Sequence, residues 1–304
     1  MLERTSPGSH SEPALDRLLR RQNWMEGVAD AVQKLVGGAY GLLGPLGRPL
    51  KDLAHGTSVL RHPLHPALTD APLGAWLTGV ILDYAATFYH VIPVQAGDVA
   101  LAFGTLAAVG AAVTGYTDFH ETYGLERRAA LTHGLVMTVV LLLEIVSLVF
   151  RWTGGRPAGI AIATIAVLLA MVGMYVGGHL TFSFGTAVNR NAFAEGPSED
   201  YVRVGAAGDF PEKVMKRVEA AGMPALVVRL DGRLCAIAAV CSHAGGPLEE
   251  GELKGGIVTC PWHGSRFDVC TGKVSGGPAT FAQPAFDVRE RDGQVELKLP
   301  IPLH

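Results

Sequence analysis

Charged residues are scarce in this chain: they make up 17% of its 304 positions, against about 25% in an ordinary soluble domain. Hydrophobic residues make up 49%, so the deficit of charge indicates that part of the chain lies in a membrane. The formal net charge is −3, and without a basic surplus we expect no nucleic acid among its partners. Met1–His10 contain no apolar run, which predicts that there is no cleavable signal peptide.

Cysteine is also scarce, with four copies in the whole chain. Two of them, Cys241 and Cys260, belong to the motifs described next. For the other two, Cys235 and Cys270, a disulfide is one alternative, but we expect each to be a small buried hydrophobic side chain.

Two short motifs near the C-terminus each offer one thiolate and one imidazole: Cys241-Ser-His243 and Cys260-Pro-Trp-His263. Two irons bridged by sulfides need four protein ligands, and these motifs can place both Cys on one iron and both His on the other. This is the mixed ligation of a Rieske [2Fe–2S] centre, whose imidazoles raise the reduction potential above that of an all-cysteine cluster. A zinc site is the alternative, but zinc fingers usually pair Cys with Cys and His with His.

Four apolar stretches, at about 67–89, 99–116, 129–150 and 160–182, predict membrane-spanning helices. Each approaches the roughly 20 residues that a helix needs to cross the hydrocarbon core. Short connections between them predict an up-down-up-down four-helix bundle. Buried helices of a soluble bundle are the alternative.

Lys and Arg residues are unevenly divided between the two ends of these stretches. One end is flanked by six of them and the other by two: Arg48, Lys51, Arg61, Arg127, Arg128 and Arg190 against Arg151 and Arg156. The positive-inside bias therefore places the first end, with the N-terminus and the C-terminal region, in the cytoplasm. We expect a multi-pass protein of the bacterial plasma (inner) membrane.

The segment before the first span has apolar residues at helical spacing with Arg residues between them, from Ala14 to Val36. This pattern predicts a basic amphipathic helix lying on the membrane surface, or packed on another part of the protein. The Gly- and Pro-rich stretch Gly37–Pro49 is predicted to be a connector.

Histidines gather at the end of the bundle that leads into the C-terminal region. We take His65, His133 and His179, with His120 as a weaker candidate, as ligands of a b-type haem between the helices. Asp70 is expected to hydrogen-bond one of these imidazoles. Ionisable groups at membrane depth are costly and tend to have functional partners, but a quinone or proton-handling site without haem, or a purely structural role, remains open.

From Asp200 onward the sequence changes to short strands and turns. Ala225–Leu230 and Arg233–Val240 flank Asp231-Gly232, a strong hairpin signal. A second Asp-Gly pair stands at 292–293, and further strands are expected around 257–260, 266–268, 286–289 and 295–299. The pattern predicts a small antiparallel barrel of about 100 residues.

Residues from about 201 to 299 resemble a Rieske ferredoxin-type domain. The resemblance lies in the first loop at 241–248, the second at 260–268, and Gly276-Gly277-Pro278-Ala279, which is similar to the proline loop that covers the cluster. It implies that Cys241 and Cys260 hold the inner iron, while His243 and His263 hold the outer, solvent-facing iron.

The sequence departs from the high-potential members of that family around the cluster. Gly246 and Trp262 stand where Rieske proteins of cytochrome bc complexes carry two further Cys, so the disulfide beside their cluster is not expected here. Ser265 keeps a hydroxyl that can bond a cluster sulfur, but Phe267 replaces the second hydroxyl donor, a Tyr. Because such bonds raise the potential, we predict a value between the ferredoxin-like and bc-type groups, nearer the former.

Residues 62–182 resemble, less specifically, an uncharacterised four-helix bacterial membrane family that is sometimes fused to Rieske domains. The resemblance rests on three motifs, at 62–76, 115–118 and 177–180. We therefore expect a multi-domain chain: an N-terminal amphipathic segment and connector (1–61), an all-α four-helix transmembrane domain (62–188), a linker (189–200) and a small all-β Rieske domain (201–304).

The function predicted from these features is membrane-anchored electron transfer. The Rieske domain would exchange single electrons with a redox partner such as a respiratory dehydrogenase or a hydrogenase, and the bundle would pass them to haem b or quinone. An electron-supplying component of an oxygenase system is one alternative, although few residues follow the predicted barrel. A membrane-tethered redox sensor is the other. We expect an electron carrier or oxidoreductase subunit rather than a stand-alone enzyme.

Overall fold

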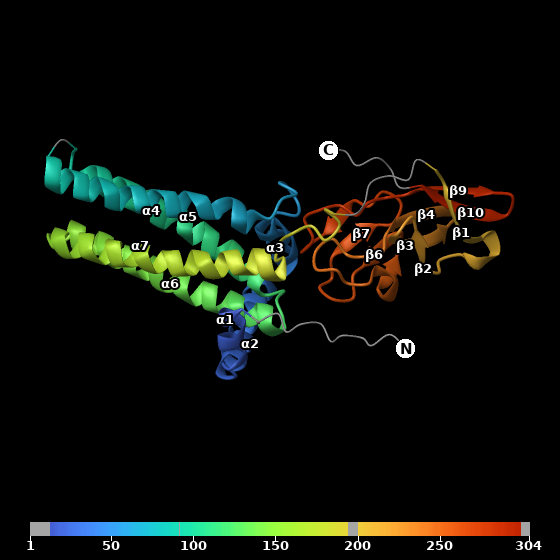
Figure 1. Cartoon of the computed structure of the whole chain (residues 1–304), viewed down its shortest axis with the longest axis horizontal. Helices are drawn as coiled ribbons and strands as arrows, with labels where there is room; N and C mark the ends of the chain where they lie inside the picture. Colours follow the sequence, from blue (N-terminus) through green and yellow to red (C-terminus); the bar gives the residue numbers. More distant parts are fainter. Residues whose placement is uncertain (1–12, 91, 194–199, 299–304) are drawn as a thin grey trace, which may run out of the picture.

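The computed structural model describes residues 13–90, 92–193 and 200–298. A long helical bundle and a small β-domain lie end to end (Figure 1). The bundle consists of α4 (Leu64–Tyr89), α5 (Gln95–Phe119), α6 (Gly124–Trp152) and α7 (Arg156–His179), which continues as a short π-helical turn, η2 (Leu180–Phe184). The predicted order, a four-helix bundle followed by an all-β domain, is confirmed.

Among the described residues, three helices are long and apolar enough to cross a membrane: α5, α6, and α7 with its continuation to Phe184. The fourth predicted span lies in α4, which is 26 residues long. This helix is less apolar because it carries His65, Asp70 and Asp83. The structure thus supports membrane association through three apolar helices, with α4 packed beside them.

Small residues allow the helices to approach one another closely, as is usual for helices packed in lipid. A Cβ atom at Gly79 of α4 would lie 2.7 Å from Leu101, and one at Gly104 of α5 would lie 2.8 Å from Trp76. Trp76 is almost fully buried and its indole donates a hydrogen bond of 3.3 Å to Thr105. Close packing of α4 on α5 therefore forms one half of an apolar core that α6 and α7 complete.

The end of the bundle remote from the β-domain is closed by a buried ionic network. Arg151 of α6 donates to both carboxylate oxygens of Asp83 at 2.6 and 2.8 Å, and to Asp98 at 3.0 Å. Arg156 of α7 also binds Asp98, at 2.8 Å. The side chains of Arg151 and Asp83 are completely buried, so this network ties all four helices together.

The N-terminal region is more helical than predicted. It forms α1 (Ala14–Arg20), α2 (Trp24–Leu42), the 3₁₀ turn η1 (Gly44–Leu46) and α3 (Gly47–His55). The expected single helix over 14–36 is interrupted after Arg20, and the prediction of a connector at 37–49 is wrong. Gly37 lies inside α2, where a Cβ would meet His120 at 2.8 Å, so this glycine serves close packing rather than a turn.

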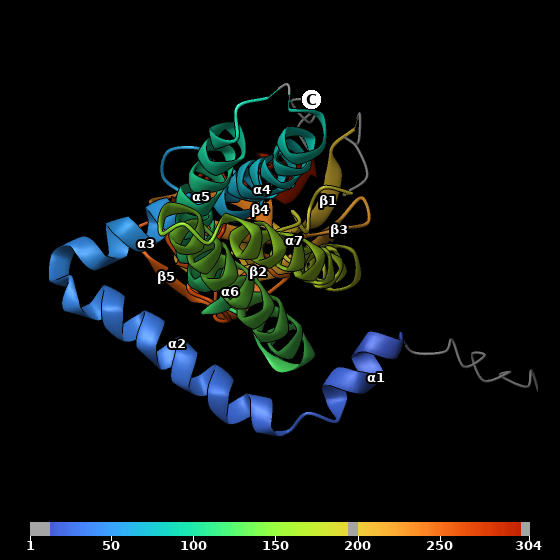
Figure 2. The same ribbon diagram turned by 90° about the vertical axis from the view of Figure 1, so that its left-hand side faces the viewer.

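Helix α2 runs across the end of the bundle, crosswise to the bundle helices (Figures 1 and 2). Arg127 of α6 forms ion pairs with Glu26 and Asp30, and Arg128 binds Glu26 at 2.7 Å. Several leucines of this region remain exposed, among them Leu35 and Leu42. This arrangement fits an amphipathic helix lying in the plane of a membrane surface.

The β-domain contains three antiparallel sheets around two apolar clusters. Their orders are β1-β10-β9, β2-β3-β4 and β5-β6-β7-β8. The strands are β1 (Val202–Ala206), β2 (Lys216–Ala220), β3 (Met223–Leu230), β4 (Arg233–Ala238), β5 (Glu252–Lys254), β6 (Ile257–Thr259), β7 (Arg266–Asp268), β8 (Val274–Gly276), β9 (Asp287–Arg291) and β10 (Gln294–Lys298).

Both predicted Asp-Gly hairpins are present. Asp231 and Gly232 connect β3 to β4 with φ values of 50° and 81°, and the second pair connects β9 to β10 with 50° and 70°. Two successive positive φ values characterise the turn that suits the twist of paired strands. The predicted end of the last strand, Leu299, and half of the predicted linker (194–199) lie outside the described residues.

Cys235 and Cys270 form a disulfide, with their Cα atoms 4.6 Å apart, so the prediction that they are two separate thiols is wrong. Cys235 lies on β4, and Cys270 lies in the turn that follows β7. These elements belong to different sheets that pack on one apolar cluster. The disulfide therefore links the strand that leads into the first cysteine motif with the segment that follows the second.

Candidate functional site

The two cysteine motifs form loops of the same shape. In the first, the Cys241 amide donates to the Gly246 carbonyl and the Gly245 amide donates to Cys241, both at 2.9 Å. In the second, the Cys260 amide donates to Ser265 at 2.8 Å and the Gly264 amide donates to Cys260 at 3.1 Å. The matching turns present one thiol and one imidazole from each loop on the same side.

The four predicted ligands come together at the tips of these loops. Cys241 and Cys260 are free, buried thiols, and the rings of His243 and His263 lie 4.8 Å apart between centroids. Nδ1 of His243 is buried without any hydrogen-bond partner. A Cβ at Gly246 would lie 2.7 Å from the Cys260 sulfur. Two sulfurs, two imidazoles and an unpartnered ring nitrogen fit the donor set of a Rieske [2Fe–2S] cluster.

The local electrostatics favour two neutral imidazoles and a Cys260 thiolate, which are protonation states that bind iron. Burial, together with the nearby His263 and His55, lowers the pKa of His243 to about 3. Burial also lowers the pKa of His263, so both imidazoles are neutral at physiological pH. A hydrogen bond from Cys241 lowers the pKa of Cys260 to about 6, while the same contact and burial raise the pKa of Cys241.

The side chains expected around the cluster surround these loops. Ser265 is fully buried, and its hydroxyl accepts a 3.0 Å hydrogen bond from the Ala279 amide of the proline loop. The hydroxyl proton remains available to a cluster sulfur. Phe267 is buried in the same apolar cluster as Cys241 and Cys260, whereas Trp262 is 53% exposed.

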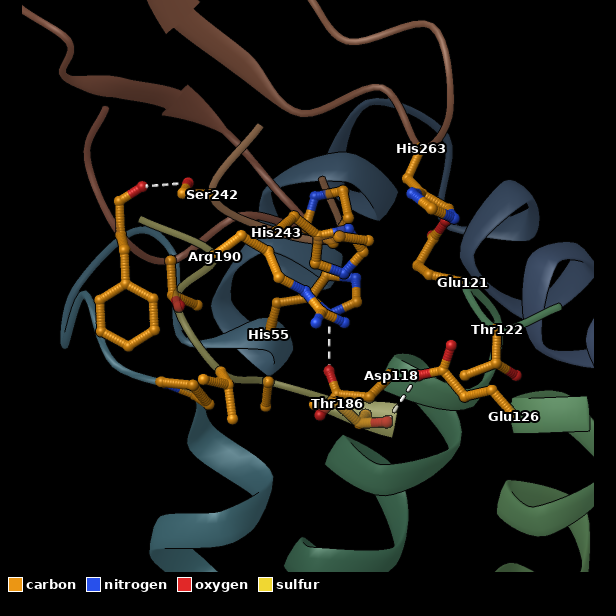
Figure 3. A pocket seen from close by; sticks show the side chains of 18 residues that line it. His55, Asp118, Glu121, Thr122, Glu126, Thr186, Arg190, Ser242, His243 and His263 are labelled. Carbon is orange, nitrogen blue, oxygen red and sulfur yellow. Dashed lines mark hydrogen bonds and ion pairs between the residues drawn. The ribbon is translucent and has the colours of Figure 1, made fainter. Parts of the chain in front are cut away.

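A cavity of about 60 Å³ separates the cluster loops from the helical bundle (Figure 3). His243, His263 and Pro278 line it from the β-domain, and His55 and Asp118 line it from the helices. Nδ1 of His55 lies 2.7 Å from Asp118, and its Nε2 is buried without a hydrogen-bond partner. No local sequence pattern singles out His55, since His55 and Asp118 are 63 positions apart and meet only in the folded chain.

The β-domain is held on the bundle by contacts next to this cavity. The Thr57 hydroxyl donates to the Ala279 carbonyl, and the Gly277 amide donates to Asp52, both at 3.0 Å. The ring of Tyr123 lies 5.3 Å from that of His263. The cluster histidines and the proline loop therefore face the membrane domain rather than solvent alone.

Of the four candidate histidines in the bundle, the structure brings two together. His65 and His133 lie 6.1 Å apart between ring centroids and line a separate cavity of about 330 Å³ between the helices. His179 instead binds Asp16 of α1 at 2.7 Å and Ser183 at 3.0 Å.

The structure places the other two residues predicted for this site, His120 and Asp70, elsewhere. His120 lies at the end of α5, with Nδ1 3.1 Å from Glu121 and 3.3 Å from Lys51. Burial alone would raise the pKa of Glu121, but hydrogen bonds from His120 and Lys51 hold it at about 2. Asp70 is exposed on α4 and no hydrogen bond joins it to a histidine among the described residues. His120 and Asp70 thus lie apart from the cavity of His65 and His133.

Comparison with known proteins agrees with both halves of the structure. The sequence model of the Rieske [2Fe–2S] domain matches residues 200–287, and that of a predicted membrane protein family, DUF2231, matches residues 61–190. Ferredoxin CarAc of Metapseudomonas resinovorans is 34% identical over 96 residues, which cover 31% of this chain and 90% of the relative. The anthranilate 1,2-dioxygenase ferredoxin subunit of Burkholderia cepacia is 33% identical over 96 residues, covering 32% of this chain and 89% of the relative.

Among solved structures, the ferredoxin of carbazole 1,9a-dioxygenase from Nocardioides aromaticivorans IC177 is 29% identical, with a TM-score of 0.32. The match covers 33% of this chain and 97% of that one. A Rieske domain carries a [2Fe–2S] cluster, which exchanges one electron at a time, so the chain has an electron-transfer role. It belongs to the Rieske [2Fe–2S] family, with its Rieske domain fused behind a DUF2231 membrane domain.

Proposed function

We propose that this protein is a membrane-anchored electron carrier. It passes single electrons between a redox partner on the side of the Rieske domain and an acceptor inside the helical bundle, namely haem b, a quinone or both. One observation carries the proposal: the cavity that meets the cluster histidines and the cavity that holds His65 and His133 share walls. Asp118, Thr122, Thr186 and Ala187 line both.

The chain's own residues hold the cluster site in a fixed position on the bundle. Cys241, His243, Cys260 and His263 would hold the cluster, which supplies one-electron chemistry when bound. Asp52 and Thr57 hold the proline loop against α3 and the turn after it. Because hydrogen bonds between side chains of the helical region and the backbone of the proline loop fix this contact, the cluster histidines stay at the entrance to the bundle.

The redox partner is proposed to dock near Trp262, whose ring is exposed and lies 6.3 Å from that of His263. A respiratory dehydrogenase or a hydrogenase is the proposed class of partner. The imbalance of Lys and Arg at the two ends of the bundle supports a cytoplasmic position for the Rieske domain. We assign the chain to the bacterial plasma membrane, with units at 1–61, 62–188, 189–200 and 201–304.

A second candidate function is the supply of electrons to an oxygenase. It is favoured by the relatives, since one is named as the ferredoxin subunit of anthranilate 1,2-dioxygenase. The contact between the cluster loops and the bundle argues for the first function, because it turns His243 and His263 toward the membrane domain.

The test is reoxidation of the reduced cluster in the full chain, reconstituted in lipid vesicles that contain a quinone. The cluster is reduced chemically, and its EPR signal is followed with time. We expect rapid decay in the natural protein and decay at least tenfold slower in the double variant D52N/T57V, which loses the contacts of the proline loop. An unchanged rate of reoxidation, with the EPR line shape preserved, would mean that the bundle only anchors the Rieske domain and does not accept its electrons.

A further inference from the structure

We propose that His65 and His133 are the two axial ligands of one haem b in the bundle cavity. The inference rests on the proposed function in that it names the acceptor inside the membrane domain. It is carried by a pattern of contacts that occurs twice in the bundle, once around each imidazole.

The separation of the two rings matches that of two axial ligands on one metal. They project from α4 and α6, with centroids 6.1 Å apart and planes inclined at 77°. With roughly 2 Å for each metal–imidazole bond, two rings that bind one metal from opposite sides have centroids about 6 Å apart. The observed separation therefore leaves room for one metal ion between the rings, and the two planes are free to differ in rotation about the axis.

Each imidazole is held in the tautomer that binds a metal through Nε2. Nδ1 of His65 lies 2.9 Å from the carbonyl oxygen of Ala111, and Nδ1 of His133 lies 2.9 Å from that of Gly173. Since a carbonyl oxygen can only accept, both Nδ1 atoms carry a proton. Both Nε2 atoms keep their lone pairs, and no hydrogen bond occupies them among the described residues. Metal-bound histidines usually donate their other N–H in this way.

Glycine allows the neighbouring helix to approach each ring. A Cβ at Gly115 of α5 would lie 2.7 Å from the His65 ring, and one at Gly177 of α7 would lie 3.1 Å from the His133 ring. In both cases the glycine comes four residues after the residue whose carbonyl binds the imidazole. The same arrangement on two helical hairpins indicates a built site rather than an incidental contact of two histidines.

The surroundings suit a flat, apolar macrocycle. The cavity of about 330 Å³ draws its walls from all four helices and is lined largely by apolar side chains such as Trp76, Met137 and Leu141. The polar Tyr116 hydroxyl at its edge is already bonded to Thr138 at 2.8 Å. A tetrapyrrole brings four nitrogens of its own, so two imidazoles complete its iron coordination, whereas a bare ion would need further protein ligands.

The test uses the full-length protein purified in detergent from cells supplied with haem precursor. We expect sharp α and β absorption bands on reduction, and one iron per chain beyond the two of the cluster. The variants H65A and H133A should lose these bands while keeping the EPR signal of the cluster. The matched control is H179Q, which changes a histidine bonded to Asp16 and Ser183 and should keep them.

A further variant, H65G, distinguishes the loss of a ligand from misfolding, because added imidazole should restore the haem bands only if the cavity is folded. Natural protein without haem bands, or bands retained in both H65A and H133A, would overturn the inference. Haem-free protein whose reduced cluster is still rapidly reoxidised by quinone would overturn this inference alone and leave the proposed function intact.

Discussion

At the scale of single residues, the cluster site was predictable and the contacts around it were not. The four ligands sit in two short motifs whose spacing is local, so the sequence indicated them directly. His55, Asp118 and Asp52 reach the site only through tertiary packing. The contact between Thr57 and Ala279 joins residues 222 positions apart, which no local pattern reveals.

The hydroxyl groups near the cluster lead to a prediction about its reduction potential. S265A removes a donor beside the cluster and should lower the potential, while F267Y adds one and should raise it, since hydrogen bonds to cluster sulfurs stabilise the reduced form. A hydrogen bond of about 1 kcal/mol corresponds to about 40 mV for one electron. Potentiometric titration followed by EPR measures both values. Shifts of the same sign in the two variants would refute this account.

Glu121 leads to a prediction about acid stability. Its pKa is about 2 in the folded protein against an ordinary 4.5, so its contribution to stability is fully present above about pH 4.5 and is lost as the pH falls toward 2. The loss should be on the order of 2 kcal/mol. The Tm, measured by thermal unfolding between pH 6 and pH 3, should fall less steeply with decreasing pH for E121Q than for the natural protein. Parallel curves for the two proteins would contradict the assignment.

At the scale of elements, apolar length predicted the helices of the bundle, and turn chemistry predicted the hairpins. The N-terminal region was harder, because Gly37 and Gly38 are usual signals of a break, whereas both lie inside α2 and Gly37 allows close packing against His120. The position of His179 could not be predicted for a related reason. Its partner Asp16 lies 163 positions earlier, on a helix whose docking site the sequence does not specify.

The ion network at the far end of the bundle gives a prediction at this scale. R151M leaves the buried Asp83 carboxylate with only the 3.5 Å contact to Arg156, which should destabilise the helical domain by about 3 kcal/mol. The double variant D83L/R151M removes both charges and should recover most of that loss. Thermal unfolding in detergent, followed by circular dichroism, compares the two. A double variant less stable than R151M would show that the pair itself provides the stability.

At the scale of the whole molecule, the orientation in the membrane brings two observations into conflict. The positive residues at the end near the Rieske domain favour the cytoplasm, whereas disulfides such as Cys235–Cys270 persist mainly in oxidising compartments. The sequence did not show this conflict, because the pairing of these cysteines depends on how two sheets pack together.

The conflict can be resolved with reporter fusions. Alkaline phosphatase, which is active only outside the cytoplasm, should be inactive when joined after residue 193 and active when inserted between α4 and α5. With this topology, C235A/C270A should change the stability of the protein inside cells little, since the disulfide would be reduced there. The reverse pattern of reporter activity would move the Rieske domain to the outer side, where loss of the disulfide should cost about 2–4 kcal/mol.

The repeated arrangement around His65 and His133 has a consequence for the origin of this bundle. Each helical hairpin carries one imidazole on its first helix, and a carbonyl followed by a glycine on its second. Two identical copies of such a hairpin, associating about a twofold axis, would already present a pair of opposed imidazoles. A gene encoding half of this bundle would suffice for an ancestral homodimer, and its duplication and fusion would free the halves to diverge.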